Sequence, residues 1–124
     1  MPVVVAVAVG GAAGSVLRYA LASWVTHATR FGGAGTLAVN IIGAFALGLL
    51  LGLIESRFQN IPRPLASGLG IGVLGGFTTF SSFMWDTVEH AEAGRWFVAG
   101  ALLTVTLVLG LGAMVAGLAV GRAA

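Results

Sequence analysis

The chain has 124 residues, of which 58% are hydrophobic and only 8% are charged, and its mean hydropathy is +1.03. A soluble domain carries about a quarter charged residues, so this composition excludes a water-soluble globular protein. The net charge of +2 without any basic cluster excludes a nucleic-acid-binding protein, and the absence of cysteine excludes disulfides, iron–sulfur clusters and thiol catalysis.

Four apolar stretches follow one another along the chain, each close to the ~20 residues that a bilayer requires. They cover about residues 3–25, 35–54, 64–84 and 96–120, and the connectors between them are short. The first stretch is longer than a signal peptide's apolar region and has no basic segment before it, so we interpret it as a retained span. The sequence predicts an all-α membrane protein with one four-helix domain over residues 1–124, too small to enclose a polar path unless two copies pair.

Small residues recur one helical turn apart in several of these spans. Gly10 and Gly14 form one such pair, and Gly48 and Gly52 form another. Because packing replaces the hydrophobic driving force inside a membrane, such pairs predict helices whose backbones approach closely.

The arginines give little indication of how the chain is oriented in the membrane. Arg57, Arg63 and Arg122 fall on one predicted side, against Arg30 and Arg95 on the other. One interpretation is that a bias of one residue is sufficient for the positive-inside rule. The other is that the chain inserts both ways and assembles as an antiparallel dimer.

Arg18 interrupts the first apolar span, where a charge costs about 2.5–3.5 kcal/mol on insertion scales. It follows Gly10 and Gly14 at four-residue spacing, which predicts that it faces packed protein. Arg18 either extends to the membrane surface or forms an electropositive vestibule for anions, and we favour the vestibule because charges inside spans are usually functional.

Two further spans place polar groups on stripes of small residues. Thr36 and Asn40 lie one turn apart in the second span, and Asn40 could either bond to another helix or replace water around an anion. In the fourth span, Thr106 shares a face with Gly110 and Gly117, whereas Thr104 points elsewhere. Thr106 is therefore the better candidate for an interior position, although a threonine that bonds back to its own helix is common.

Residues 75–83 are the most informative part of the chain. Glycines, hydroxyl residues and aromatic residues stand together in the middle of the third span: Gly75, Gly76, Phe77, Thr78, Thr79, Phe80, Ser81, Ser82 and Phe83. Two glycines before β-branched threonines form helix poorly, so we expect the third helix to break in the middle of the membrane. Carbonyl groups freed there must be buried in protein or bound to an ion. The phenylalanines could be core residues, but their ring edges carry positive partial charge, and together with the hydroxyls they would suit an anion.

Catalytic and metal-binding patterns are missing from the predicted spans. No acidic residue lies deep in any of them, which argues against proton-coupled exchange. His27 and His90 fall in connectors without metal-ligand spacing, and no Ser–His or paired-carboxylate arrangement is visible at membrane depth. We therefore expect no enzyme.

At residues 75–83 the sequence resembles the Fluc (CrcB) family of fluoride channels. Residues 10–19 (GGAAGSVLRY) and 35–43 (GTLAVNIIG) match the family's first and second spans in order, so the resemblance covers essentially the whole chain. It implies an antiparallel, dual-topology homodimer in the bacterial plasma membrane. This dimer would export fluoride passively and relieve fluoride toxicity.

The resemblance also assigns roles to individual residues. It implies two pores lined by Asn40, Phe80, Ser81, Phe83 and Thr106, with Thr36 towards a vestibule. The helix break would hold a structural sodium ion at the dimer centre, bound by the backbone carbonyls of Gly75 and Thr78 from both subunits. This chain has Ser82 where Thr is usual, Asp86 where Glu is usual and Leu102 where Tyr is frequent, so the outer part of its polar track differs.

Two other functions are alternatives to a channel. A small dual-topology exporter of drugs or cations would need a carboxylate inside the membrane, which the predicted spans lack. An accessory subunit of a larger membrane complex would explain the glycine pairs. It would not explain hydroxyls and aromatic rings at a helix break.

Overall fold

The computed structural model describes residues 2–124 as an all-helical chain. Four helical segments are long and apolar enough to cross a membrane: α1 (Val3–Thr29), α2 (Ala34–Ser56), the segment Arg63–Glu92 and α6 (Trp96–Ala123). The prediction of four membrane helices is thus confirmed. The helices continue past the predicted apolar stretches, because backbone hydrogen bonding extends into the interfacial region, where polar side chains remain solvated.

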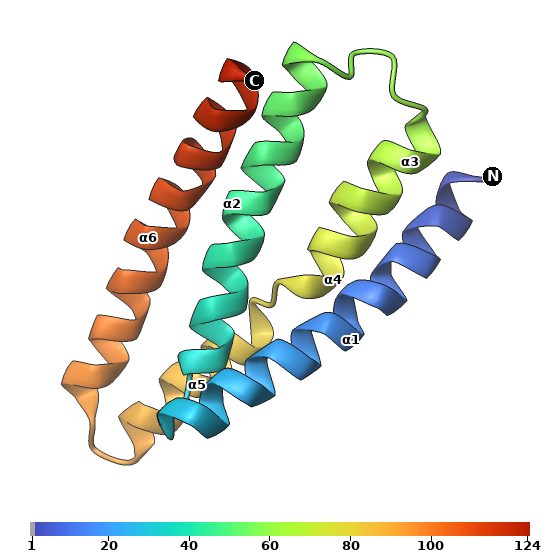
Figure 1. Ribbon diagram of the computed structural model, residues 1–124. Coiled ribbons are helices and arrows are strands. Elements are labelled where there is room, and N and C mark those ends of the chain that lie inside the picture. Colours follow the sequence, from blue (N-terminus) through green and yellow to red (C-terminus); the bar gives the residue numbers. More distant parts are fainter. Residues whose placement is uncertain (1) are drawn as a thin grey trace.

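The third segment is made of several pieces. α3 (Arg63–Ser67) has a proline in its first turn and leads directly into η1 (Gly68–Leu74), a π-helical stretch, and α4 (Gly75–Phe77). Residues 78–80 are not helical, Thr78 is extended (φ −90°, ψ 159°), and α5 (Ser81–Glu92) then begins. Figure 1 shows that the chain changes direction between α4 and α5. The sequence did not predict the π-helical stretch.

Glycines bring the helix backbones together at two interfaces. α2 and α6 lie side by side (Figure 1), and a Cβ added to Gly48 would overlap the carbonyl oxygen of Met114. At the second interface, between α1 and η1, a Cβ on Gly10 would overlap the carbonyl oxygen of Gly68. Both interfaces have the close backbone packing that the glycine spacing predicted.

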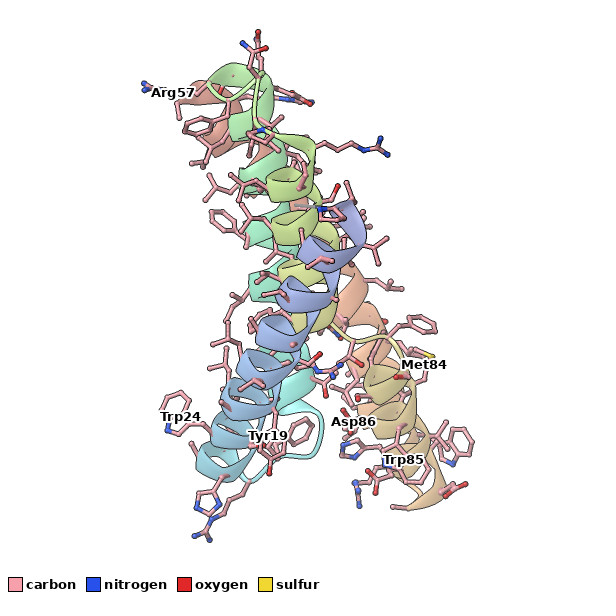
Figure 2. All side chains as sticks on the ribbon, turned by 90° about the vertical axis from the view of Figure 1, so that its right-hand side faces the viewer. Tyr19, Trp24, Arg57, Met84, Trp85 and Asp86 are labelled. Atoms are coloured by element: carbon pink, nitrogen blue, oxygen red, sulfur yellow. The ribbon has the colours of Figure 1, made fainter. Side chains whose placement is uncertain are left out.

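The two ends of the helical bundle carry different side chains. Figure 2 shows Arg57 at one end and Tyr19, Trp24 and Trp85 towards the other. Tyrosine and tryptophan are typical of the interface between membrane and water, because each ring combines an apolar body with a polar edge. The exposed rings therefore indicate where the bundle leaves the hydrocarbon layer at that end.

Candidate functional site

The non-helical residues of the third segment are held to α2 by one side chain. The Nδ2 of Asn40 donates to the carbonyl oxygen of Thr79 (2.9 Å), and the backbone N–H of Thr79 donates to the Oδ1 of Asn40 (2.8 Å). An amide carries two N–H donors, so the second N–H of Asn40 is left over from this pair. Asn40 thus bonds to the non-helical part of the third segment, and its second N–H remains available to another acceptor.

This arrangement releases two backbone carbonyls from helical hydrogen bonding. In a continuous helix the N–H of Thr79 would bond to the carbonyl of Gly75, but it bonds to Asn40 instead. The N–H of Ser82 would likewise bond to the carbonyl of Thr78, but it donates to the Oγ1 of Thr79 (3.3 Å). The carbonyls of Gly75 and Thr78 therefore do not receive their usual helical donors.

Close packing against α2 fixes the position of the non-helical residues. A Cβ on Gly43 would overlap the Cγ2 of Thr78. The Oγ1 of Thr78 donates back to the carbonyl oxygen of Leu74 (3.1 Å), within its own segment. Gly43 and Asn40 therefore hold this stretch from one helix, through steric contact and hydrogen bonds respectively.

Two phenylalanine rings stand where α5 begins. Phe80 is 74% exposed, whereas Phe83 is only 7% exposed. The rings meet edge to face, with centroids 6.5 Å apart and an interplanar angle of 85°. Ser81 is exposed beside them. The ring of Phe80, with its positively polarised edge, and the hydroxyl of Ser81 thus lie together on a face that this subunit leaves open, whereas the ring of Phe83 is buried against Phe80.

Thr104 and Thr106 have different environments on α6. The Oγ1 of Thr104, an exposed residue, donates to the carbonyl oxygen of Gly100 (2.9 Å). Thr106 is 9% exposed, and its buried Oγ1 has no hydrogen-bond partner among residues 2–124. A buried hydroxyl without a partner is costly, so the hydroxyl of Thr106 is a candidate ligand for a polar group from outside the subunit.

A cleft of about 490 Å³ lies between α1, the start of α2 and α5. Thr36 lines it, and its charged and titratable residues are His27, Asp86 and Glu89. Asp86 has a buried Oδ2 without a partner in the described part of the chain. The half-buried Arg18 is not among the lining residues, so the structure does not place Arg18 and Thr36 in one cleft. The sequence did not predict that Asp86 lines a cleft, although its position three residues after Phe83 was a signal.

Side-chain metal ligands do not gather anywhere within residues 2–124. No group of three or more His, Cys, Asp or Glu side chains there could hold a metal ion. Among the described residues, the released carbonyls of Gly75 and Thr78 remain candidate oxygen ligands for a cation.

Comparison with known proteins identifies the family. The model of the CrcB-like protein family, described as camphor resistance (CrcB), matches residues 5–118. The chain is 45% identical over 120 residues to the fluoride-specific ion channel FluC of Pseudomonas putida, covering 96% of each chain. It is 46% identical over 124 residues to the FluC of Allorhizobium ampelinum, covering 96% of this chain and 95% of that one. Because this similarity extends over nearly the full length of both relatives, the chain belongs to the CrcB-like family.

Proposed function

We propose that this protein is a fluoride channel of the bacterial plasma membrane that exports fluoride passively and thereby relieves its toxicity. The relatives that it matches over nearly their whole length are named fluoride-specific ion channels. The structural observation that carries the proposal is the exposed Phe80 beside Ser81 at a non-helical stretch. As a member of a channel family, the protein is not an enzyme. The relatives favour neither a drug or cation exporter nor an accessory subunit.

Fluoride holds its water strongly, so a pore must offer replacement donors along the path. The remaining amide N–H of Asn40 and the hydroxyls of Ser81 and Thr106 are neutral donors, and the edges of Phe80 and Phe83 add positive partial charge. None of these groups carries a full charge that would trap an anion, and a conducting site must release its ion as well as bind it. Arg18 raises the local anion concentration near the pore, and Thr36 lies at the entrance formed by its cleft.

The pore requires a second copy of the chain. One subunit leaves Phe80 exposed, and a Cβ added to Gly75 would meet nothing beyond its own helical turn closer than the Gly70 carbonyl oxygen at 3.8 Å. A partner that covers this face would shelter both residues and enclose the polar groups. The near balance of arginines between the two sides supports an antiparallel arrangement of the two copies.

The non-helical residues 78–80, which form the interruption of the third helix, lie in the middle of the membrane. The interruption holds a sodium ion at the dimer centre. The carbonyls of Gly75 and Thr78 are free of their usual helical donors, and carbonyls at membrane depth need a partner. Two copies would offer four hard oxygen atoms without a charged ligand, which suits an ion with modest coordination demands. The sodium ion has a structural role and takes no part in conduction.

Efflux from liposomes that contain only this protein tests the proposal, with fluoride and chloride compared. The parent should release fluoride and retain chloride. Phe80→Ile keeps an apolar side chain but removes the ring edge, which is worth about 0.5–1.5 kcal/mol in aromatic contacts. Fluoride flux per recovered dimer should therefore fall up to about tenfold.

Phe97→Ile is the matched control, because Phe97 is 88% exposed at the start of α6, away from the interruption. It should conduct like the parent. Equal release of fluoride and chloride by the parent would refute a fluoride-specific channel. Unchanged flux in both Phe80→Ile and Phe83→Ile would remove the phenylalanine rings from the mechanism.

A further inference from the structure

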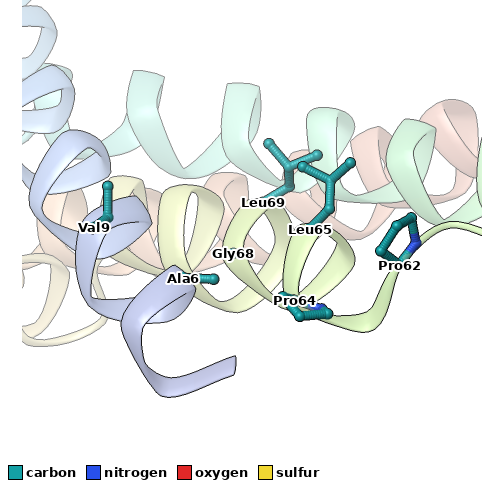
Figure 3. Close-up of a pocket in the computed structure, with 7 residues that line it drawn as sticks. All are labelled: Ala6, Val9, Pro62, Pro64, Leu65, Gly68 and Leu69. Atoms are coloured by element: carbon teal, nitrogen blue, oxygen red, sulfur yellow. The ribbon is translucent and has the colours of Figure 1, made fainter. Parts of the chain in front are cut away.

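An apolar groove lies between the start of α1 and the start of the third segment. Its volume is about 400 Å³, and its walls include Ala6 and Val9 from α1 and Leu65, Gly68 and Leu69 from α3 and η1. Figure 3 shows Leu65 and Leu69 beside each other, with Val9 on the neighbouring helix. Val9 is 62% exposed and Leu65 is 52% exposed, so the groove is open to the surroundings of the subunit.

A second groove adjoins the first around α3. Its volume is about 690 Å³, and it shares Pro62, Leu65 and Leu69 with the first groove. Its other wall is formed by the end of α2, where Leu50 and Leu53 are apolar, and its rim includes Arg57. Two apolar grooves therefore flank one helix and end at the same basic connector.

The charges at this end of the bundle are not balanced. Its only acidic residue, Glu55, is engaged by Arg122, whose Nε lies 2.6 Å from the Oε2 of Glu55. Within residues 2–124, Arg57 and Arg63 have no Asp or Glu partner, and both are exposed. The Nε–H of Arg57 donates to a backbone oxygen of Ala124 (2.9 Å), which leaves the terminal N–H groups of Arg57 for another ligand.

The opposite end of the bundle differs in charge. There Arg30 and Arg95, in the connectors, are accompanied by three acidic residues of α5: Asp86, Glu89 and Glu92. The apolar grooves thus end at the more positive end of the molecule, in the position where lipid headgroups meet the bundle.

We propose that this end of each subunit binds one anionic phospholipid. The two acyl chains occupy the two grooves on either side of α3, and the phosphate binds to Arg57 and Arg63. A guanidinium offers paired N–H donors that match two phosphate oxygens, and the apolar walls favour hydrocarbon. Basic residues next to a membrane span are attracted to anionic lipids for the same electrostatic reason.

Native mass spectrometry of the purified protein with an equimolar mixture of phosphatidylglycerol and phosphatidylcholine tests this site. The parent should retain phosphatidylglycerol in preference. In Arg57→Gln combined with Arg63→Gln, the preference should fall at least about fivefold, the factor that corresponds to ~1 kcal/mol for a basic residue near an anionic surface. Arg30→Gln, at the opposite end, should keep the preference.

A bulky side chain that fills the first groove tests whether an acyl chain binds there. Val9→Trp should reduce retention of both lipids, whereas Val16→Trp should not, because Val16 is similarly exposed on α1 (67%) but lies outside both grooves. Equal binding of the two lipids by the parent, or an unchanged preference in the double arginine variant, would overturn the proposal. Disulfide-linked dimers of Val9→Cys would overturn it too, because a second copy would then cover the groove. The chain has no other cysteine.

Discussion

The α2–α6 interface is closed within one subunit, whereas the face around the interruption is open. At the interface, a Cβ on Gly117 would overlap the carbonyl oxygen of Phe45. At the open face, a Cβ on Gly75 would have space, and Phe80 is 74% exposed. Glycine thus occurs in this chain for two different structural reasons. Gly117 is explained by its own subunit, whereas no contact within the subunit explains Gly75.

The largest effect is expected at the closed interface. Gly117→Leu forces α6 away from α2, because the new Cβ would meet backbone atoms that cannot give way. We expect a loss of more than about 3 kcal/mol, the upper range for overpacking, and little folded protein in size-exclusion chromatography. Gly112→Leu is the matched control, because a Cβ there has no atom within 4 Å, and its subunit should fold. If the two variants were recovered equally, glycine packing would not hold these helices together.

Gly75→Leu should prevent assembly of the dimer without preventing the subunit from folding. A Cβ at this exposed position has space within the subunit, so circular dichroism should show the parent's helix content. If a second copy covers this face, the same variant should elute as a monomer in size-exclusion chromatography and lose fluoride flux. A parent-like dimer would show that the partner does not pack at Gly75, and would remove the proposed sodium site from the dimer centre.

Asn40→Ala should have an intermediate effect on stability. Two hydrogen bonds to Thr79 are lost, and each is worth about 0.6–1.7 kcal/mol inside a membrane, so we expect a loss of roughly 1–3 kcal/mol in thermal unfolding. Asn60→Ala, in an exposed connector, should change stability by less than about 0.5 kcal/mol. Loss of flux in Asn40→Ala without any loss of stability would mean that the amide serves the ion and not the fold.

The smallest effect is expected for Arg18→Gln. If Arg18 concentrates anions by its field, fluoride flux should fall a few-fold, and Arg18→Glu should conduct less because the field is reversed. The difference from the parent should shrink at high ionic strength, since salt screens exposed charges. Parent-like flux in both variants at low salt would show that Arg18 only extends towards the membrane surface.

Local properties of the sequence were sufficient to predict the four membrane helices and to indicate the family. Hydropathy alone predicted four membrane helices, because each span must be apolar over the thickness of a bilayer. The motif at residues 75–83 pointed to the family that the comparisons identified. The helix ends and the π-helical stretch η1 were not predictable from hydropathy, because they depend on backbone hydrogen bonds and on packing against α1.

Only the tertiary structure decided how the polar residues are used. Asn40 and Thr79 are far apart in sequence, and their paired hydrogen bonds exist because α2 packs against the interruption. Within residues 2–124, the packing of the helices also leaves the hydroxyl of Thr106 without a partner, and it places Thr36 in a cleft with Asp86. Periodicity assigns a residue to a face of its own helix. Which donor meets which acceptor depends on how the helices pack, and no single span contains that information.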